Sequence, residues 1–342
     1  MPAYIVRRLL SGLAMLFAIT LVTFAVFRLI PMPPGCLLVP CGPNTFTNDA
    51  QIRAAAHKLG ADRPVPVQYA KFVWQIVRHG RFGNSWTGSS IDESLRVALP
   101  RTGSVLLGGI ALLLLLAIPL GALSALHAQT LIDRAVLFFA LFGIALHPFL
   151  VGVGLTRFFS HYLHLAPDGG YCHFLPVKPQ PLPPHVLPGS VPPVCGGPLA
   201  WAHHLILPWL TFALFFLPLY TRMIRARFLD TLDTQYVMAA RGRGVSEIRL
   251  LRSHALRPAV VPLATMVGLD LGGALMATIY IETIYGVGGI GSVMLGALAT
   301  NAATYDLPLV AALFFVIAAF AIFVTFAVDV LYAWLDPRVR IA

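Results

Sequence analysis

Six long apolar segments dominate the sequence and limit the folds that the chain can adopt. They cover residues 9–30, 102–126, 135–159, 203–223, 259–284 and 307–335. A helix of about 20 residues crosses the roughly 30 Å hydrocarbon layer of a bilayer, so each segment is long enough to span it. Hydrophobic residues make up 58% of the chain and charged residues only 11%, unlike a soluble domain. We therefore expect an all-α, polytopic membrane protein with six transmembrane helices.

Basic residues lie mainly at the ends of these segments. The net charge of +10 could suit nucleic acid, but the basic residues do not alternate with aromatic residues on a polar domain. Lys and Arg gather in short cytoplasmic loops of membrane proteins. The connection between the fourth and fifth segments carries Arg222, Arg225, Arg227, Arg241, Arg243, Arg249, Arg252 and Arg257. The outer loop 160–200 carries only Lys178. This distribution predicts cytoplasmic N- and C-termini and argues against nucleic-acid binding.

The polar segments divide the chain into regions. Residues 1–30 resemble a signal peptide, but the apolar stretch is too long and lacks a small-residue cleavage site, so we expect a retained first transmembrane helix. Residues 31–98 are expected to form an extracytoplasmic segment with helices at 48–59 and 67–77. Residues 99–342 are expected to form the core transmembrane domain.

All four cysteines, Cys36, Cys41, Cys172 and Cys195, fall in segments that this topology places outside. An oxidising compartment permits disulfides there. Pairing Cys36 with Cys41 and Cys172 with Cys195 closes the shortest loops, but the sequence leaves the connectivity open. The outer loop 160–200 is rich in Pro and Gly, which predicts irregular extended structure.

The polar connection at residues 224–258 is too long for a tight turn and predicts two short helices. Residue 233 or 234 can cap the first helix, and Ser246 can cap the second. Small residues in and after the first helix would allow a partner to approach closely; they are Ala239, Ala240 and Gly244. We call this helix, turn and helix the shelf, and we expect it to lie on the cytoplasmic side and to dock a partner.

Residues 236–262 resemble the coupling loop of bacterial ATP-binding-cassette (ABC) importer permeases, in their dipeptide and oligopeptide branch. Two departures from the general pattern, Met238 in place of an acidic residue and residues 254–257 in place of a hydrophobic residue with Leu-Pro, are familiar in that branch. Further segments with the same resemblance are 4–10, 82–86, 99–102, 118–121, 205–209, 282–285 and 335–338. The resemblance covers nearly the whole chain apart from the Pro-rich outer loop.

This resemblance implies a type I ABC importer permease fold with six helices in the bacterial inner membrane. It implies a second permease subunit, two ATPase subunits or one dual ATPase, and an extracytoplasmic solute-binding protein as partners. The chain itself would be non-catalytic and hold no cofactor, with ATP and Mg²⁺ on the ATPases. The residues implied in coupling to the ATPase are Tyr236, Ala239, Ala240, Gly244, His254 and Leu256.

Acidic residues within or at the edges of apolar segments are candidates for the solute pathway, because an ionisable group in a membrane needs protein or water beside it. They are Asp270, Glu282 and Asp329. The alternative for each is a hydrogen-bonded contact between helices. Glycines at 268, 272 and 273 leave room beside Asp270, where the cationic amino terminus of a peptide would fit.

Three other signals do not carry a function. The glycines between residues 286 and 291 match a dinucleotide motif, but they follow an apolar helix and lack the strand that the motif requires, so we expect a turn. No phosphate-binding loop is present, so the chain is not the ATPase. Histidines of the outer segments fit no zinc spacing, so we expect no metal site; they are His161, His164, His173, His185, His203 and His204.

Other functions remain as alternatives. A membrane-embedded enzyme would need a nucleophile motif such as Gly-x-Ser-x-Gly or a His-Glu-x-x-His metal motif, and the sequence has neither. A secondary transporter driven by an ion gradient would show an inverted repeat, and the two halves show none. The sequence does not name the solute: peptides are expected, and nickel chelates, glutathione and oligosaccharides are alternatives.

Overall fold

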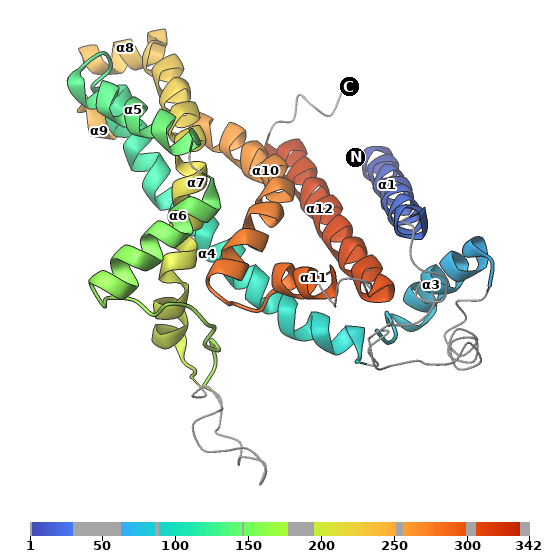
Figure 1. Cartoon of the computed structure of the whole chain (residues 1–342). Coiled ribbons are helices and arrows are strands. Elements are labelled where there is room, and N and C mark those ends of the chain that lie inside the picture. The colour runs from blue at the N-terminus through green and yellow to red at the C-terminus, as the bar shows by residue number, and fades with distance from the viewer. Residues whose placement is uncertain are drawn as a thin grey trace. The chain divides into compact units, whose positions relative to one another are not determined.

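The computed structural model is built from helices (Figure 1). It describes residues 2–29, 63–85, 89–145, 147–176, 195–250, 256–298 and 306–335. The chain divides into two compact units, Met1–Pro100 with Gly289–Ala342 and Arg101–Gly288, and each has its own packing. Several positions singled out from the sequence lie outside the described residues; they are Cys36, Cys41, His185, His254 and the helix expected at 48–59.

The first unit contains the first and last helices of the chain. Its helices are α1 (Pro2–Leu29), α3 (Val65–His79), the first turns of α4 (Ile91–Leu126), α11 (Ile290–Leu298) and α12 (Leu307–Leu335). α1 packs along α12, and a Cβ atom at Gly12 would lie only 2.8 Å from Cγ2 of Ile322. Tyr69 of α3 joins α1 through a 2.8 Å hydrogen bond between its hydroxyl and that of Thr20.

Apolar side chains from three helices form the core of this unit. The buried members come from α4, α11 and α12; they are Ile91, Leu95, Ala98, Ile290, Met294, Ala297, Val310, Ala312 and Leu313. Asp306 precedes α12, and its carboxylate accepts hydrogen bonds from the Ser85 hydroxyl and, at 3.3 Å, from the backbone N–H of Leu309. A polar side chain is thus buried at the start of α12 with its oxygens satisfied.

The second unit packs the remaining helices around α7. They are the rest of α4, α5 (Leu131–Ala145), α6 (Pro148–Leu155), the π-helical turn η1 (Thr156–Tyr162), α7 (Pro198–Leu232), α8 (Gln235–Gly242), α9 (Glu247–Leu250) and α10 (Leu256–Ile284). α5, α6 and α10 all contact α7. α4 approaches α7 so closely that a Cβ atom at Gly109 would lie 2.7 Å from the ring of Phe212. α7 is therefore the central helix of this unit.

A disulfide closes the loop between η1 and α7. Cys172 and Cys195 are joined, and the strand-like bridge between His173 and Gly196 lies beside them. The backbone N–H of Gly170 donates a 2.7 Å hydrogen bond to the Tyr285 carbonyl, at the end of α10. A side chain at the neighbouring Gly169 would collide with that carbonyl. The ends of the loop expected at 160–200 are helical, since η1 extends to Tyr162 and α7 begins at Pro198. Between them the described residues 163–176 and 195–197 contain no helix, and residues 177–194 lie outside the described residues.

Several expected boundaries differ from the structure. α7 runs to Leu232 and α10 begins at Leu256, so both ends of the connection expected at 224–258 are helical and belong to these long helices. α4 begins at Ile91, so the last residues of the segment expected at 31–98 are helical and continue into the membrane segment. α11 lies within the stretch 286–306, where only a turn and an outer loop were expected. Gly286 and Gly288 do form a turn with positive φ, and the helix begins directly after it at Ile290.

The span expected at 135–159 is broken. α5 ends at Ala145 and α6 begins at Pro148, after His147 in an extended conformation. Proline has no N–H to continue a helix and disfavours helical geometry in the residue before it. The Nδ1 atom of His147 accepts a 3.2 Å hydrogen bond from the N–H of Phe149, so it caps the new helix. The expectation of one continuous helix was wrong because it ignored Pro148.

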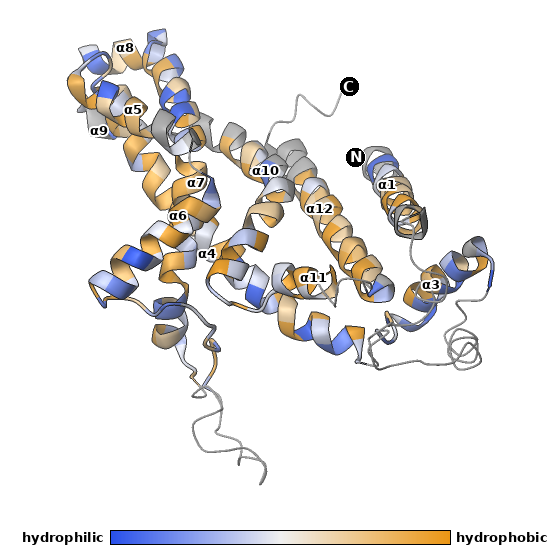
Figure 2. Cartoon of the chain, viewed as in Figure 1, coloured by the Kyte–Doolittle hydropathy of each residue, from blue (hydrophilic) through white to orange (hydrophobic). Residues whose placement is uncertain are grey.

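Four helical stretches among the described residues are long and apolar enough to cross a membrane. They are Arg7–Ala25, Ile91–Leu126, Pro198–Leu232 and Pro308–Ala327. Figure 2 shows apolar residues along α12 and many polar residues where α7 meets α8. The chain is therefore a multi-pass membrane protein with a polar end on its second unit.

Candidate functional site

The shelf is a folded element with its own small core. Leu232 at the end of α7, Val237 of α8 and Leu250 of α9 are buried against one another, and Ala240 and Val245 pack on them. α8 starts after Thr234, whose carbonyl accepts hydrogen bonds from the N–H groups of Val237 and Met238 at 3.1 and 3.0 Å. The expected side-chain cap is absent here: the Thr234 hydroxyl instead donates to the Thr231 carbonyl, at 2.6 Å. Three apolar side chains thus join both shelf helices to α7.

Gly244 ends α8 with a backbone conformation that favours glycine. Its φ is +81°. Its N–H donates to the Arg241 carbonyl at 3.0 Å, and the Val245 N–H donates to the Ala240 carbonyl at 3.3 Å. This pair of hydrogen bonds is the Schellman motif, which places a left-handed residue after the helix and brings Val245 against Ala240. Gly244 therefore sets the direction in which the chain leaves α8 for α9.

The two faces of α8 differ. Val237 and Ala240 face the core of the shelf, whereas Ala239 is exposed. Tyr236 and Met238 are 50% and 51% exposed, so large apolar side chains lie on the outside of a polar region. Larger contiguous apolar patches mark partner surfaces, so this face of α8 is the candidate docking surface of the shelf. Of the small residues proposed for docking, Ala239 lies on the exposed face and Ala240 on the inner one.

The structure describes two of the remaining residues expected to couple to the ATPase, Gly244 and Leu256. A Cβ atom at Gly244 would meet no described atom within 4 Å, so this position has open space around it. Leu256 is the first residue of α10. Arg241, Arg243 and Arg249 are exposed around the shelf and make this end of the unit basic.

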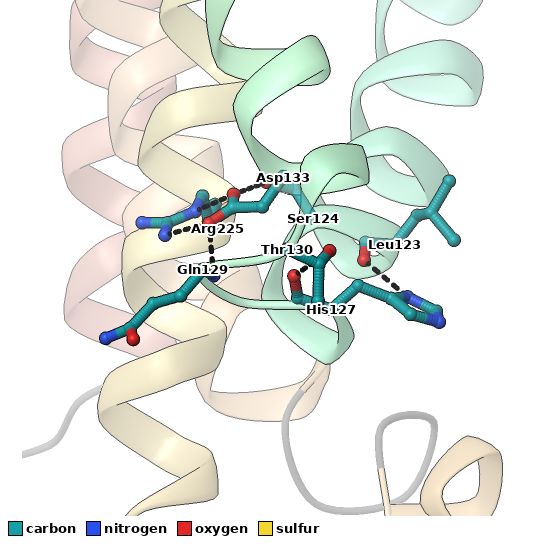
Figure 3. A network of polar contacts seen from close by, with 7 residues as sticks. All are labelled: Leu123, Ser124, His127, Gln129, Thr130, Asp133 and Arg225. Atoms are coloured by element: carbon teal, nitrogen blue, oxygen red, sulfur yellow. Dashed lines mark hydrogen bonds and ion pairs between the residues drawn. The ribbon is translucent and has the colours of Figure 1, made fainter.

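A buried ion pair ties α7 to the turn between α4 and α5 (Figure 3). The guanidinium of Arg225 donates from Nε to Oδ1 of Asp133 at 2.6 Å and from Nη2 to Oδ2 at 2.7 Å. The Ser124 hydroxyl donates to Oδ1 at 2.5 Å, and the N–H of Gln129 donates to Oδ2 at 2.9 Å. Asp133 is 2% exposed. Four donors therefore hold one buried carboxylate.

The hydrogen bonds from the Arg225 guanidinium hold the pKa of the Asp133 carboxyl well below its usual range. Burial opposes this effect, and the hydrogen bonds from Ser124 and Gln129 add to it. The carboxylate is thus charged at any physiological pH. The sequence places Arg225 among the cytoplasmic arginines and carries no local signal that pairs it with Asp133, because the two residues are 92 positions apart.

The two candidate pathway residues in α10 have different surroundings. Glu282 is fully buried and accepts a 2.5 Å hydrogen bond from the Thr102 hydroxyl of α4, which is a contact between helices. Asp270 lies beside Tyr220 of α7, and its Oδ2 atom is buried with no hydrogen-bond partner among the described residues. The side chain of Asp329 is outside the described residues. Of Glu282 and Asp270, Asp270 is thus the one with a buried carboxylate oxygen that lacks a hydrogen-bond partner among the described residues.

One group of possible metal ligands occurs among the described residues: Cys172, Cys195 and His204, with ligand atoms within 4.8 Å of one another. The Cys172 sulfur lies 3.2 Å from Nδ1 of His204. A cysteine binds metal as a thiolate, and both sulfurs are joined in the disulfide. The disulfide therefore crosslinks two parts of the outer loop, and the contact between Cys172 and His204 holds this loop against α7.

Comparison with known proteins places the chain among transport proteins. A family model described as "Binding-protein-dependent transport system inner membrane component" matches residues 117–341, and one described as the N-terminal part of such a membrane component matches residues 1–90. A protein of Brucella suis biovar 1 (strain 1330) named "Putative peptide permease protein" is 32% identical over 344 residues, which is 100% of each chain. The "Probable D,D-dipeptide transport system permease protein DdpB" of Escherichia coli K12 is 32% identical over 98% of this chain and 97% of its own.

A solved structure shares the fold. It is a chain of the MetNI methionine ABC transporter in an inward-facing conformation, with a TM-score of 0.50 over 70% of this chain and 96% of that chain. The sequence identity is 14%, so the likeness concerns the fold alone.

Proposed function

Because the chain belongs to the family of inner membrane components of binding-protein-dependent transport systems, we propose that it forms the path for peptides or similar small solutes in an ATP-driven importer. Its relatives that are named for peptides and for a D,D-dipeptide support this solute class. The family consists of membrane components, so the chain is a non-catalytic subunit.

The proposed assembly contains a second permease, two ATPase subunits or one dual ATPase, and an extracytoplasmic binding protein. ATP and Mg²⁺ belong to the ATPases. The chain would lie in the bacterial inner membrane with six spans and both termini in the cytoplasm. The exposed arginines at the shelf support this orientation, because basic residues gather on the cytoplasmic side.

The shelf would dock the ATPase through the exposed face of α8. The observation that carries this proposal is the combination of exposed Tyr236, Met238 and Ala239 with a buried Val237 that fixes α8 to α7. A push on α8 would pass directly into α7 because the shelf core includes Leu232 of that helix.

The ion pair described above would carry the same motion further. Arg225 lies in α7 about two turns before its end, and Asp133 lies in the first turn of α5. A displacement of α7 would therefore move the α4–α5 turn with it. This arrangement gives the ATPase a mechanical connection to three membrane helices.

Replacing Ala239 by Trp tests the docking face. We expect the complex with Ala239→Trp to reach the membrane at normal levels, but to lose peptide uptake into proteoliposomes and stimulation of ATP hydrolysis by the loaded binding protein. Ala226→Trp is the matched control, since Ala226 is also exposed but lies on α7. Normal uptake by the Ala239 variant would contradict docking through this face.

Two further measurements test orientation and solute. A cysteine introduced at Ser246 should resist an impermeant thiol reagent added outside intact cells, and labelling from outside would overturn the topology. Radiolabelled di- and oligopeptides should accumulate only when the ATPase and ATP are present. Accumulation by this chain alone would indicate an ion-gradient carrier, and competition by nickel chelates, glutathione or oligosaccharides would identify another solute.

A further inference from the structure

A small cavity lies between α4, α7 and α10 in the second unit. Its wall is mostly apolar and includes Ile110 and Leu113 of α4 and Phe212 and Phe216 of α7. The polar groups of the lining are Tyr220 of α7 and Asp270 of α10. One carboxylate and one phenol therefore lie beside each other in the wall of an aromatic and aliphatic pocket.

One oxygen of the Asp270 carboxylate lacks a partner among the described residues. Its Oδ2 atom is buried and accepts no hydrogen bond from them, while the Tyr220 hydroxyl interacts with the carboxylate. A buried carboxylate oxygen without a partner is costly in an apolar site, because it has lost its water without gaining a hydrogen bond or a counter-charge. A cation in the cavity would remove this cost.

The size and chemistry of the cavity select the kind of cation. Its free volume is about 10 Å³, which is close to the minimum needed by one water-sized group. A metal ion such as Ca²⁺ or Mg²⁺ takes six or more oxygen ligands, far more than one carboxylate and one phenol provide. A primary ammonium group has about the size of a water molecule and bonds a carboxylate. Phe212 and Phe216 line the cavity, and aromatic rings are compatible with an ammonium group beside them.

We propose that this cavity binds the primary ammonium group of a solute, with the Asp270 carboxylate as its counter-ion and the Tyr220 hydroxyl as a second polar contact. The inference rests on the proposed function, since it assumes that the solute passes along this chain. The cavity has room for about one water-sized group, so the ammonium group would occupy it and the rest of the solute would lie outside. The site would favour solutes with a free amino group and reject trimethylated or acetylated ones.

Methylammonium chloride is the probe, and the purified complex in detergent is the sample. A ligand that binds only the folded protein raises its unfolding temperature. At ten times its dissociation constant, methylammonium should raise the unfolding midpoint of this subunit by about 2–4 °C. Potassium chloride and tetramethylammonium chloride at equal concentration should give no such rise. Asp270→Asn should abolish the methylammonium effect.

The outcomes separate the possibilities. No rise with methylammonium, or an equal rise with Asp270→Asn, would overturn the site. An equal rise in the unfolding midpoint with potassium would indicate a site for an inorganic cation. An equal rise with tetramethylammonium would show that the cavity does not select by size. Either result would overturn the proposed ammonium site. If the Asp270→Asn protein does not accumulate, Tyr220→Phe serves as the second variant. It keeps the Asp270 carboxylate but removes the hydroxyl, and it should reduce the methylammonium-induced rise in the unfolding midpoint. The measurement needs no transport, so absent ATP-dependent uptake would refute the proposed function separately.

Discussion

Breaking the ion pair between Asp133 and Arg225 should destabilise the second unit strongly. Removing one member of a buried pair costs about 3–5 kcal/mol, because the other charge stays buried without its partner. The Arg225 side chain is 21% exposed, which lets water replace part of the lost interaction. The Ser124 and Gln129 donors would also remain on the carboxylate. We therefore expect Arg225→Gln to lower the free energy of unfolding by about 3 kcal/mol.

A double-mutant cycle isolates the pair from other effects of each substitution. Asp133→Asn keeps the shape but turns an NH₂ group toward N–H donors, so we expect a loss of about 2–3 kcal/mol. In the double variant the losses should not add, and the coupling energy should be about 2 kcal/mol. The assay is reversible unfolding in mixed detergent micelles, followed by circular dichroism.

The chain offers a matched control in the same helix. Arg227 and Asp230 form an exposed pair at 4.0 Å, with side chains 54% and 71% exposed. Their cycle should give about 0.3–0.5 kcal/mol, as for exposed pairs three or four residues apart in a helix. If the Asp133–Arg225 cycle gave the same small value, the buried pair would not connect α7 to the α4–α5 turn as argued.

The remaining predictions concern pH, a helix terminus and the disulfide. The pKa of Asp133 is lower in the folded than in the unfolded protein, so its carboxylate stabilises the fold fully above the unfolded pKa of about 3.9 and loses this effect as pH falls through the folded pKa. The difference in free energy of unfolding between wild type and Asp133→Asn should therefore be constant from pH 8 to 5 and shrink in acid. Gly244→Ala should destabilise the shelf by about 1–2 kcal/mol, because φ is positive at this position. Gly242→Ala, within α8, should stabilise it by up to about 1 kcal/mol. Hydrogen exchange across α8 measures both changes, and equal effects of the two substitutions would contradict the Schellman ending. Peptide mapping of non-reduced protein should find Cys172 joined to Cys195, and replacing both by Ser should cost about 3 kcal/mol through the freed loop; fully alkylatable cysteines would refute the link.

Some features of this protein follow from the sequence alone because they depend on neighbouring residues. Hydropathy summed over about 20 residues predicts a membrane span, and the segment expected at 307–335 coincides with α12. Helix endings are equally local: glycine favours the left-handed conformation that follows a helix, and Gly244, with a φ of +81°, lies just after the end of α8. The interruption before Pro148 was also written in the sequence, although the apolar run concealed it.

Contacts between side chains of different helices are determined by the tertiary structure. Asp133 and Arg225 are 92 positions apart, and only the packing of α5 against α7 brings them together. The same holds for the cavity at Asp270, whose wall comes from three helices. Hydropathy indicates that a helix is buried in lipid or protein, but it does not indicate which side chains contact each other. Those contacts depend on the rotation and register of the helices, which are set by packing between whole helix surfaces. Four of the six expected spans are therefore matched by long apolar helices among the described residues, whereas the break before Pro148 and the buried partners of the charged residues were not predicted.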